Sequence, residues 1–220
     1  MKIIALTDLH GRTDIFTTLE TKLREADLIL LCGDITHFGH EAVAAFMIGA
    51  LRKINPSVLA VSGNCDNSDV ERYLVLENIS LFGTVRIIAG ISFAGMSGSL
   101  PCPGPTPNEY SEEEFGAILG GVFPIKELPF ILVSHQPPFH TVNDCVSPGK
   151  HVGSRTLRRF IERTEPLACF TGHIHEGIGT DHIGTTVVVN PGPAFSGGYA
   201  MAEIEAGQIR NVSVRNVNEA

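Results

Sequence analysis

The chain has 220 residues, of which 43% are hydrophobic and 18% are charged, and this ordinary globular composition argues against intrinsic disorder. Its net charge of −8 at pH 7 argues against a broad surface for the phosphates of nucleic acid, and no apolar run approaches the roughly 18–20 residues of a membrane span. The length suits one domain over residues 1–220, and five dispersed cysteines without Cys-X-X-Cys spacing indicate reduced thiols and a cytoplasmic location.

Apolar runs and helical stretches alternate through the first third of the sequence. The first run carries one charge and leads into an acid, so we expect a first strand and not a signal peptide. The alternation predicts βαβ units with a mainly parallel sheet. The expected strands cover residues 2–6, 28–32 and 58–61, and the expected helices cover residues 15–24 and 40–54.

Two long loops interrupt the middle of the sequence, at residues 95–109 and 136–153. Loops of this length are usually functional or mobile, so we expect substrate specificity to reside in them. The natural substrate itself cannot be deduced from their sequences. Around the loops we expect strands at residues 85–89, 91–94, 130–133 and 167–170 and helices that begin at Ser111 and Ser154.

The C-terminal stretch predicts hairpins, with turns at Gly184 and at Ala206-Gly207. The expected strands cover residues 177–182, 185–189, 199–204 and 209–214. A parallel first half followed by an antiparallel second half predicts two sheets packed face to face, with helices outside.

Side chains that bind metals directly follow five of the expected strands. Ligands of open α/β sheets bind beyond the carboxyl ends of the strands, so we expect these side chains to converge at one edge. They are Asp8, His10, Asp34, Asn64, His135, His173 and His175.

Two divalent ions about 3.5–4 Å apart can hold both the attacking and the leaving oxygen of a phosphoryl group. A shared carboxylate offsets the repulsion between the ions, and Asp34, alone after its strand, suits that role. Asp8 and His10 would share a face if the chain stays extended, and His173 and His175 could reach both ions across a turn. The imidazoles favour manganese, our first expectation, or iron, zinc, nickel or cobalt over magnesium and calcium.

The same residues form five motifs that resemble, in order, the signature blocks of the calcineurin-like metallophosphoesterase superfamily. Within it, the sequence Ser-His-Gln-Pro-Pro at residues 134–138 looks like the small single-domain bacterial and archaeal phosphoesterases. The resemblance implies an α/β fold, a four-layer αββα sandwich of two mixed sheets flanked by helices. The blocks are Asp-X-His at residues 8–10, Gly-Asp-X4-Gly at 33–39, Gly-Asn-X-Asp at 63–66, the lone His135 and Gly-His-X-His at 172–175.

The resemblance also implies a role for each residue. A hydroxide that bridges two ions would attack phosphorus in line. One ion would bind Asp8, His10, Asp34 and His175, and the other would bind Asp34, Asn64, His135 and His173.

One residue departs from the family pattern. Most members carry His after the Asn of the third block, where this chain has Cys65, although similar small phosphodiesterases also carry Cys. A thiol is a poor general acid at neutral pH, so Asn64 and Cys65 are only candidates for catalytic roles, and we expect leaving groups that depart without help. Arg12 and His37 are candidates for substrate binding. Asp66 and Asn67 are read as caps of a helix that starts near Ser68.

The leading hypothesis is a dinuclear-metal phosphodiesterase on a small or nucleotide-like substrate. A phosphomonoesterase, a nuclease and a non-catalytic metal-binding scaffold are the alternatives. The acidic balance disfavours nucleic acid as a partner. A membrane is not expected as a partner, and nothing in the sequence indicates a homo-oligomer.

Overall fold

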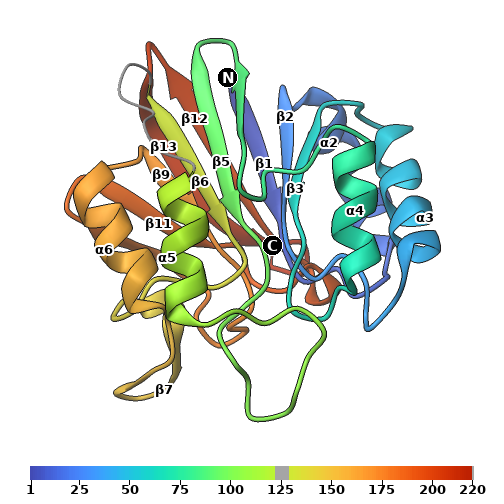
Figure 1. The fold of residues 1–220 in the computed structure, drawn as a ribbon. Coiled ribbons are helices and arrows are strands. Elements are labelled where there is room, and N and C mark those ends of the chain that lie inside the picture. Colours follow the sequence, from blue (N-terminus) through green and yellow to red (C-terminus); the bar gives the residue numbers. More distant parts are fainter. Residues whose placement is uncertain (122–128, 220) are drawn as a thin grey trace.

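The computed structural model describes residues 1–121 and 129–219, and the strands in this part of the chain form two large sheets (Figure 1). The first sheet has the strand order β13-β12-β1-β2-β3. Its first three strands along the chain are parallel, and the C-terminal hairpin joins them antiparallel beside β1. The bounds are β1 (Lys2–Leu6), β2 (Leu28–Cys32), β3 (Val58–Val61), β12 (Gly198–Glu205) and β13 (Gln208–Asn216).

The second sheet has the order β10-β11-β9-β6-β5-β4. Its four central strands are parallel, and only the two edge strands run antiparallel. The prediction of a parallel first half and an antiparallel second half is therefore wrong, because each C-terminal hairpin extends a different, mixed sheet. The bounds are β4 (Val85–Ile88), β5 (Ile91–Met96), β6 (Phe130–Ser134), β9 (Ala168–Phe170), β10 (Gly179–Ile183) and β11 (Thr186–Asn190).

Helices cover the outer face of each sheet (Figure 1). The expected helix over residues 15–24 is two short helices, since the chain leaves helical geometry at Leu19. The 136–153 loop holds a 3₁₀ turn, η1 (Val142–Asp144), and a small hairpin of β7 (Cys145–Ser147) and β8 (Lys150–His151), and a second 3₁₀ turn is η2 (Ala194–Ser196). The helices are α1 (Asp14–Thr18), α2 (Glu20–Glu25), α3 (Glu41–Arg52) and α4 (Ser68–Leu76) beside the first sheet, and α5 (Glu112–Gly121) and α6 (Arg155–Thr164) beside the second.

Three apolar clusters fill the spaces between the layers. Successive residues of a strand point to opposite faces, so Ile3 packs between the sheets while Ile4 packs against the helices of the first sheet. In the third cluster Leu132 of β6 packs with Phe115 of α5 and Phe160 of α6. Each fully buried side chain of this size stabilises the fold by roughly 1.5–3 kcal/mol. The four-layer αββα sandwich is confirmed.

The loops that follow the parallel strands lie at one end of the sandwich. The loop after β5 and the β7–β8 hairpin project from that end, the lower one in Figure 1. Among the described residues, no helix has the length and apolarity needed to cross a bilayer. The fold therefore collects the loops that carry the predicted metal ligands at a single rim.

Candidate metal centre

The structure brings the seven predicted ligands together where β1, β2, β3, β6 and β9 end. The chain is not extended through Asp8 and His10, the condition under which they would share the face of a strand, because both have positive φ angles of 53° and 47°. Asp34 and His173 share this left-handed geometry, with φ angles of 49° and 67°. Such a conformation is strained for residues other than glycine, and it turns these side chains sharply toward the rim.

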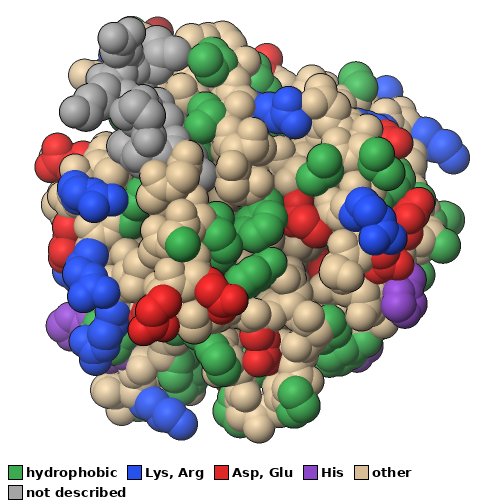
Figure 2. Space-filling model, viewed as in Figure 1, with side chains coloured by type: hydrophobic (Ala, Val, Ile, Leu, Met, Phe, Trp, Pro, Cys, Tyr) green, Lys and Arg blue, Asp and Glu red, His purple; other side chains and the backbone are tan. Residues whose placement is uncertain are grey.

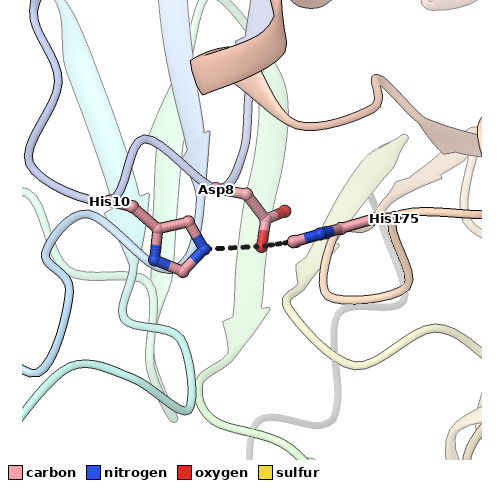
Figure 3. Close-up of side chains that lie close together, drawn as sticks. All are labelled: Asp8, His10 and His175. Carbon is pink, nitrogen blue, oxygen red and sulfur yellow. Dashed lines mark hydrogen bonds and ion pairs between the residues drawn. The ribbon is translucent and has the colours of Figure 1, made fainter.

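One group of ligands surrounds a carboxylate oxygen of Asp8 (Figure 3). Asp8 Oδ1 lies 3.2 Å from His175 Nε2 and 3.8 Å from His10 Nε2. The other oxygen, Oδ2, accepts hydrogen bonds from the Thr7 hydroxyl at 2.7 Å and from the backbone N–H of His173 at 3.2 Å. These bonds fix the carboxylate so that Oδ1 faces the two imidazoles.

Asp34 lies between this group and a second one. Its Oδ2 is 3.7 Å from His10 Nε2, and its Oδ1 is 3.4 Å from His135 Nε2. The backbone N–H of Cys65 donates to Oδ1 at 2.8 Å. The two oxygens thus face imidazoles on opposite sides, which is the arrangement that a shared carboxylate requires.

The donor atoms around His135 fit a cation. The buried ring donates from Nδ1 to the carbonyl of Cys32 at 2.8 Å, so its Nε2 carries a lone pair when the ring is neutral. That nitrogen points at Asn64 Oδ1, 2.9 Å away, and at Asp34 Oδ1. Three lone-pair atoms converge where only a proton or a metal ion can relieve their repulsion. Oxygen and imidazole donors in this number suit a divalent transition metal.

Burial and neighbouring charges together set the pKa values of the side chains at the rim. Burial alone would lower the pKa of His135, but the Asp34 carboxylate outweighs burial and raises it to about 9. Burial also works against ionisation of Asp34, yet His135 and His10 hold its pKa below the ordinary value. Burial, reinforced by the neighbouring His135, lowers the pKa of His173 to about 4. Asp34 is therefore an anion at neutral pH and His173 a neutral donor.

His173 lies beside His135, with ring centroids 5.2 Å apart. Its Nε2 is 3.8 Å from the sulfur of Cys102, which the sequence analysis did not single out. Cys102 belongs to the Pro-rich loop after β5, and only the length of that loop signalled a role in function.

Asp66 does not have the role of helix cap that was predicted for it. It is fully buried and does not cap α4. Asn67 occupies the N-cap position of α4, but its side chain makes no capping hydrogen bond and instead donates to the carbonyls of Phe38 and Gly39. The two carboxylate oxygens of Asp66 accept hydrogen bonds from the backbone N–H groups of Ile35, Thr36 and Gly63 and from the Thr36 hydroxyl. Asp66 therefore ties the loop of Asp34 to the loop of Asn64. Burial and the nearby Asp34 charge raise its pKa to about 6.

Close approach of backbone explains two glycines at the rim. A Cβ on Gly63 would lie 2.0 Å from Asp34 Oδ1, and a Cβ on Gly172 would lie 1.8 Å from the Thr7 hydroxyl oxygen. Neither position has room for any larger residue.

Of the other candidate site residues, the structure places Cys65 and His37 beside the candidate ligands and Arg12 away from them. Cys65 lies at the rim, where its sulfur, a His10 nitrogen and an Asp34 oxygen all lie within 4.8 Å of one another. Burial, followed by the charge of Asp34, raises the pKa of its thiol, which stays protonated at neutral pH. His37 Nδ1 is 3.2 Å from His10 Nδ1, so this residue reaches the group around Asp8. Arg12 does not, because its exposed guanidinium binds the carboxylate of Asp14 at 3.0 Å.

One known protein is similar to this chain in sequence, and solved structures are similar to it in architecture. An uncharacterized protein of Methanocaldococcus jannaschii is 40% identical over 202 residues, which cover 88% of each chain. The crystal structure of a Thermus thermophilus protein has a TM-score of 0.77 at 19% identity and covers 98% of both chains. The purple acid phosphatase PPD1 of yellow lupin has a TM-score of 0.56 at 12% identity over 97% of this chain and 48% of its own. At such identities the two solved structures show the fold alone.

The family profile described as the calcineurin-like phosphoesterase superfamily domain matches residues 1–207, a range that holds all the candidate ligands. Its members are associated with metal-dependent hydrolysis of phosphoesters, which agrees with the donor set at the rim. The chain belongs to the calcineurin-like phosphoesterase superfamily.

Proposed function

We propose that this protein is a dinuclear-metal phosphodiesterase that acts on a small or nucleotide-like ester. The observation that carries the proposal is the position of Asp34, whose two carboxylate oxygens face His10 on one side and His135 on the other. A carboxylate placed in this way can hold two cations at the spacing that phosphoryl transfer requires.

The residues divide into two ligand sets around Asp34. Two divalent ions would supply charge neutralisation for the phosphoryl oxygens and activation of water when bound. Manganese is our first choice, since the donors mix carboxylate oxygens with imidazole nitrogens. The first set is Asp8, His10, Asp34 and His175, and the second is Asp34, Asn64, His135 and His173.

The side chains next to the ligands determine whether the protein can protonate a leaving group and how it can contact the substrate. The protonated Cys65 thiol offers no efficient proton to a leaving oxygen at neutral pH, so we expect esters whose leaving group departs as a stable anion. His37, beside His10, is the nearer of the two predicted substrate contacts. Arg12 would have to leave Asp14 before it could contact a phosphate.

The test compares bis(4-nitrophenyl) phosphate with 4-nitrophenyl phosphate after the purified protein has been loaded with manganese and its metal content measured. We expect about two ions per chain and a higher kcat/KM on the diester. A higher kcat/KM on the monoester would make the protein a monoesterase instead. Cleavage of single-stranded DNA with neither small ester consumed would indicate a nuclease. Two bound ions without turnover of any ester would support a scaffold.

A further inference from the structure

A cavity of about 600 Å³ that is wide open to solvent is lined in part by the segment that follows the candidate ligand His175. One wall is the segment from Thr141 to His151, which contains η1 and the β7–β8 hairpin, and the other is the segment that follows His175. Glu176 lines the cavity and is the next residue after the ligand His175, so their Cα atoms are about 3.8 Å apart. The lining of the cavity therefore begins one residue after a candidate ligand in the chain.

The two walls are joined by hydrogen bonds and close contact. The Asn143 amide donates to the carbonyls of Gly177 and Gly179, at 2.9 and 3.0 Å. A Cβ on Gly177 would lie 2.2 Å from the Asn143 carbonyl oxygen, so only glycine permits this approach. The N–H of Val142 donates to Asp181 Oδ2 at 2.8 Å. These contacts hold the cavity open before any ligand binds.

Asp144 and two side chains of α6 stabilise the first wall of the cavity. The buried Asp144 carboxylate accepts hydrogen bonds from three backbone N–H groups and from His151 Nδ1, at 2.7 to 3.0 Å. Basic side chains lie along the flank of the molecule formed by α6, on the left in Figure 2. Arg158 donates to the carbonyls of Phe139 and His140, and the Arg155 guanidinium lies 3.7 Å above the Phe139 ring. These two arginines therefore hold the loop against α6.

The lining of the cavity selects an uncharged, ring-bearing ligand. Among the described residues that line it there is no Lys or Arg, and Glu176 and Asp181 both carry carboxylates, so the cavity does not suit a second phosphate. The side chains of Val142, Val146 and Ile178 offer apolar surface, and the rings of His140 and His151 lie 4.9 Å apart in an edge-to-face arrangement. Glu176, on the side nearest the metal centre, can accept hydrogen bonds from hydroxyl groups.

We propose that this cavity binds the organic substituent of the phosphoester, and that the substituent is a nucleoside. Its volume falls in the range of about 300–1,000 Å³ that small-molecule sites occupy. The base would pack against the apolar and imidazole side chains, and the ribose hydroxyls would donate to Glu176. This inference rests on the proposed phosphoesterase function, because it places the phosphate at the metal centre.

The test uses two diesters with the same leaving group, adenosine 5′-(4-nitrophenyl phosphate) and methyl 4-nitrophenyl phosphate. We expect the manganese-loaded protein to have a kcat/KM at least about tenfold higher on the adenosine ester, which corresponds to roughly 1.4 kcal/mol. Val142→Trp should abolish this ratio while it changes kcat/KM on the methyl ester less than twofold. Val75→Trp on α4 is the matched control, since Val75 is 56% exposed and Val142 is 50% exposed. Ser147→Trp in the hairpin replaces Val142→Trp if that variant does not fold.

Calorimetric titration with adenosine alone gives a readout without catalysis. We expect binding to the wild type and to Val75→Trp, and none to Val142→Trp. Equal kcat/KM on both diesters, unchanged by Val142→Trp, would overturn the nucleoside subsite and leave the phosphoesterase standing. If neither diester is hydrolysed, the proposed function fails, and absence of adenosine binding would then reject the cavity as well.

Discussion

Two buried aspartates fix loops by accepting hydrogen bonds from backbone N–H groups. Asp66 does so at the metal-ligand rim, and Asp144 does so in the wall of the cavity. Asp66 binds backbone N–H groups from the loops that follow β2 and β3, and Asp144 binds those of the loop that follows β6. Both carboxylates are fully buried. Asp66 lies near the charge of Asp34, whereas Asp144 bonds to the imidazole of His151.

Under the two proposals above, the chemistry and the selectivity of the site have separate supports. The metal-ligand rim holds groups that every substrate would meet. The cavity wall holds groups that only a large substituent would reach. Damage to the rim should therefore lower activity on all esters, and damage to the wall should lower it on large esters alone.

The substitution with the largest expected effect is Asp34→Asn, which tests the role of the metal-ligand rim. A neutral amide removes the shared negative charge between the two ligand sets, so we expect kcat/KM to fall on the order of 10³-fold on every ester, together with the metal content. Steady-state kinetics and elemental analysis measure both. Glu113→Gln, at an exposed acid on α5, is the control, and a tenfold loss confined to one ester would contradict a shared role for Asp34.

Asp66→Asn tests the rim without touching a ligand. The amide nitrogen cannot accept a hydrogen bond, so at least one buried donor loses its partner, and we expect the free energy of unfolding to fall by roughly 3 kcal/mol. Urea denaturation gives this value. Bound metal should decrease as well, because the loops of Asp34 and Asn64 would no longer be tied together. Unchanged stability and metal content would show that the tie is dispensable.

Asp144→Asn is the matching change in the wall. We expect a loss of roughly 2 kcal/mol in unfolding free energy and a fall of several-fold in kcat/KM on the adenosine diester. The methyl diester should be hydrolysed at nearly the wild-type rate with full metal content. An equal loss of kcat/KM on both diesters would show that Asp144 does not support the cavity wall alone.

The smallest effect should come from Cys65→Ala, although Cys65 lies at the rim. The thiol neither carries a charge nor gives up a proton readily at neutral pH, so we expect less than about a tenfold loss on an aryl phosphodiester. Parallel kinetics with Asp34→Asn provide the scale. Equal and nearly complete losses from both changes would refute a dispensable thiol.

The sequence predicts the rim better than the wall, for a physical reason. Metal ligands come from a short list of residue types, and here Asp, His and Asn directly follow apolar runs, so the candidate ligands Asp8, Asp34 and His135 stand out in the printed sequence. The wall depends on single side chains that bond to backbone, such as Asn143 and Asp144, and backbone partners leave no mark in a sequence. The β7–β8 hairpin was missed because its strands are three and two residues long.

The errors at the rim have local causes. The left-handed backbone at Asp8 and His10 was not expected, because non-glycine residues rarely adopt it and the surrounding loops impose it here. Asp66 has the spacing of a helix cap, and only the fold reveals that its partners lie about thirty residues earlier. The sequence also does not show that one C-terminal hairpin would join β1 and the other β9.

The position of β1 also bears on synthesis of the protein. The amino group of Met1 donates to the carbonyl of Ile204, 203 residues later, so β12, one of the two neighbours of β1 in the sheet, is synthesised long after it. Until then the nascent strand has an open edge that can pair with other chains. We therefore expect chains that stop before the last hairpin to aggregate.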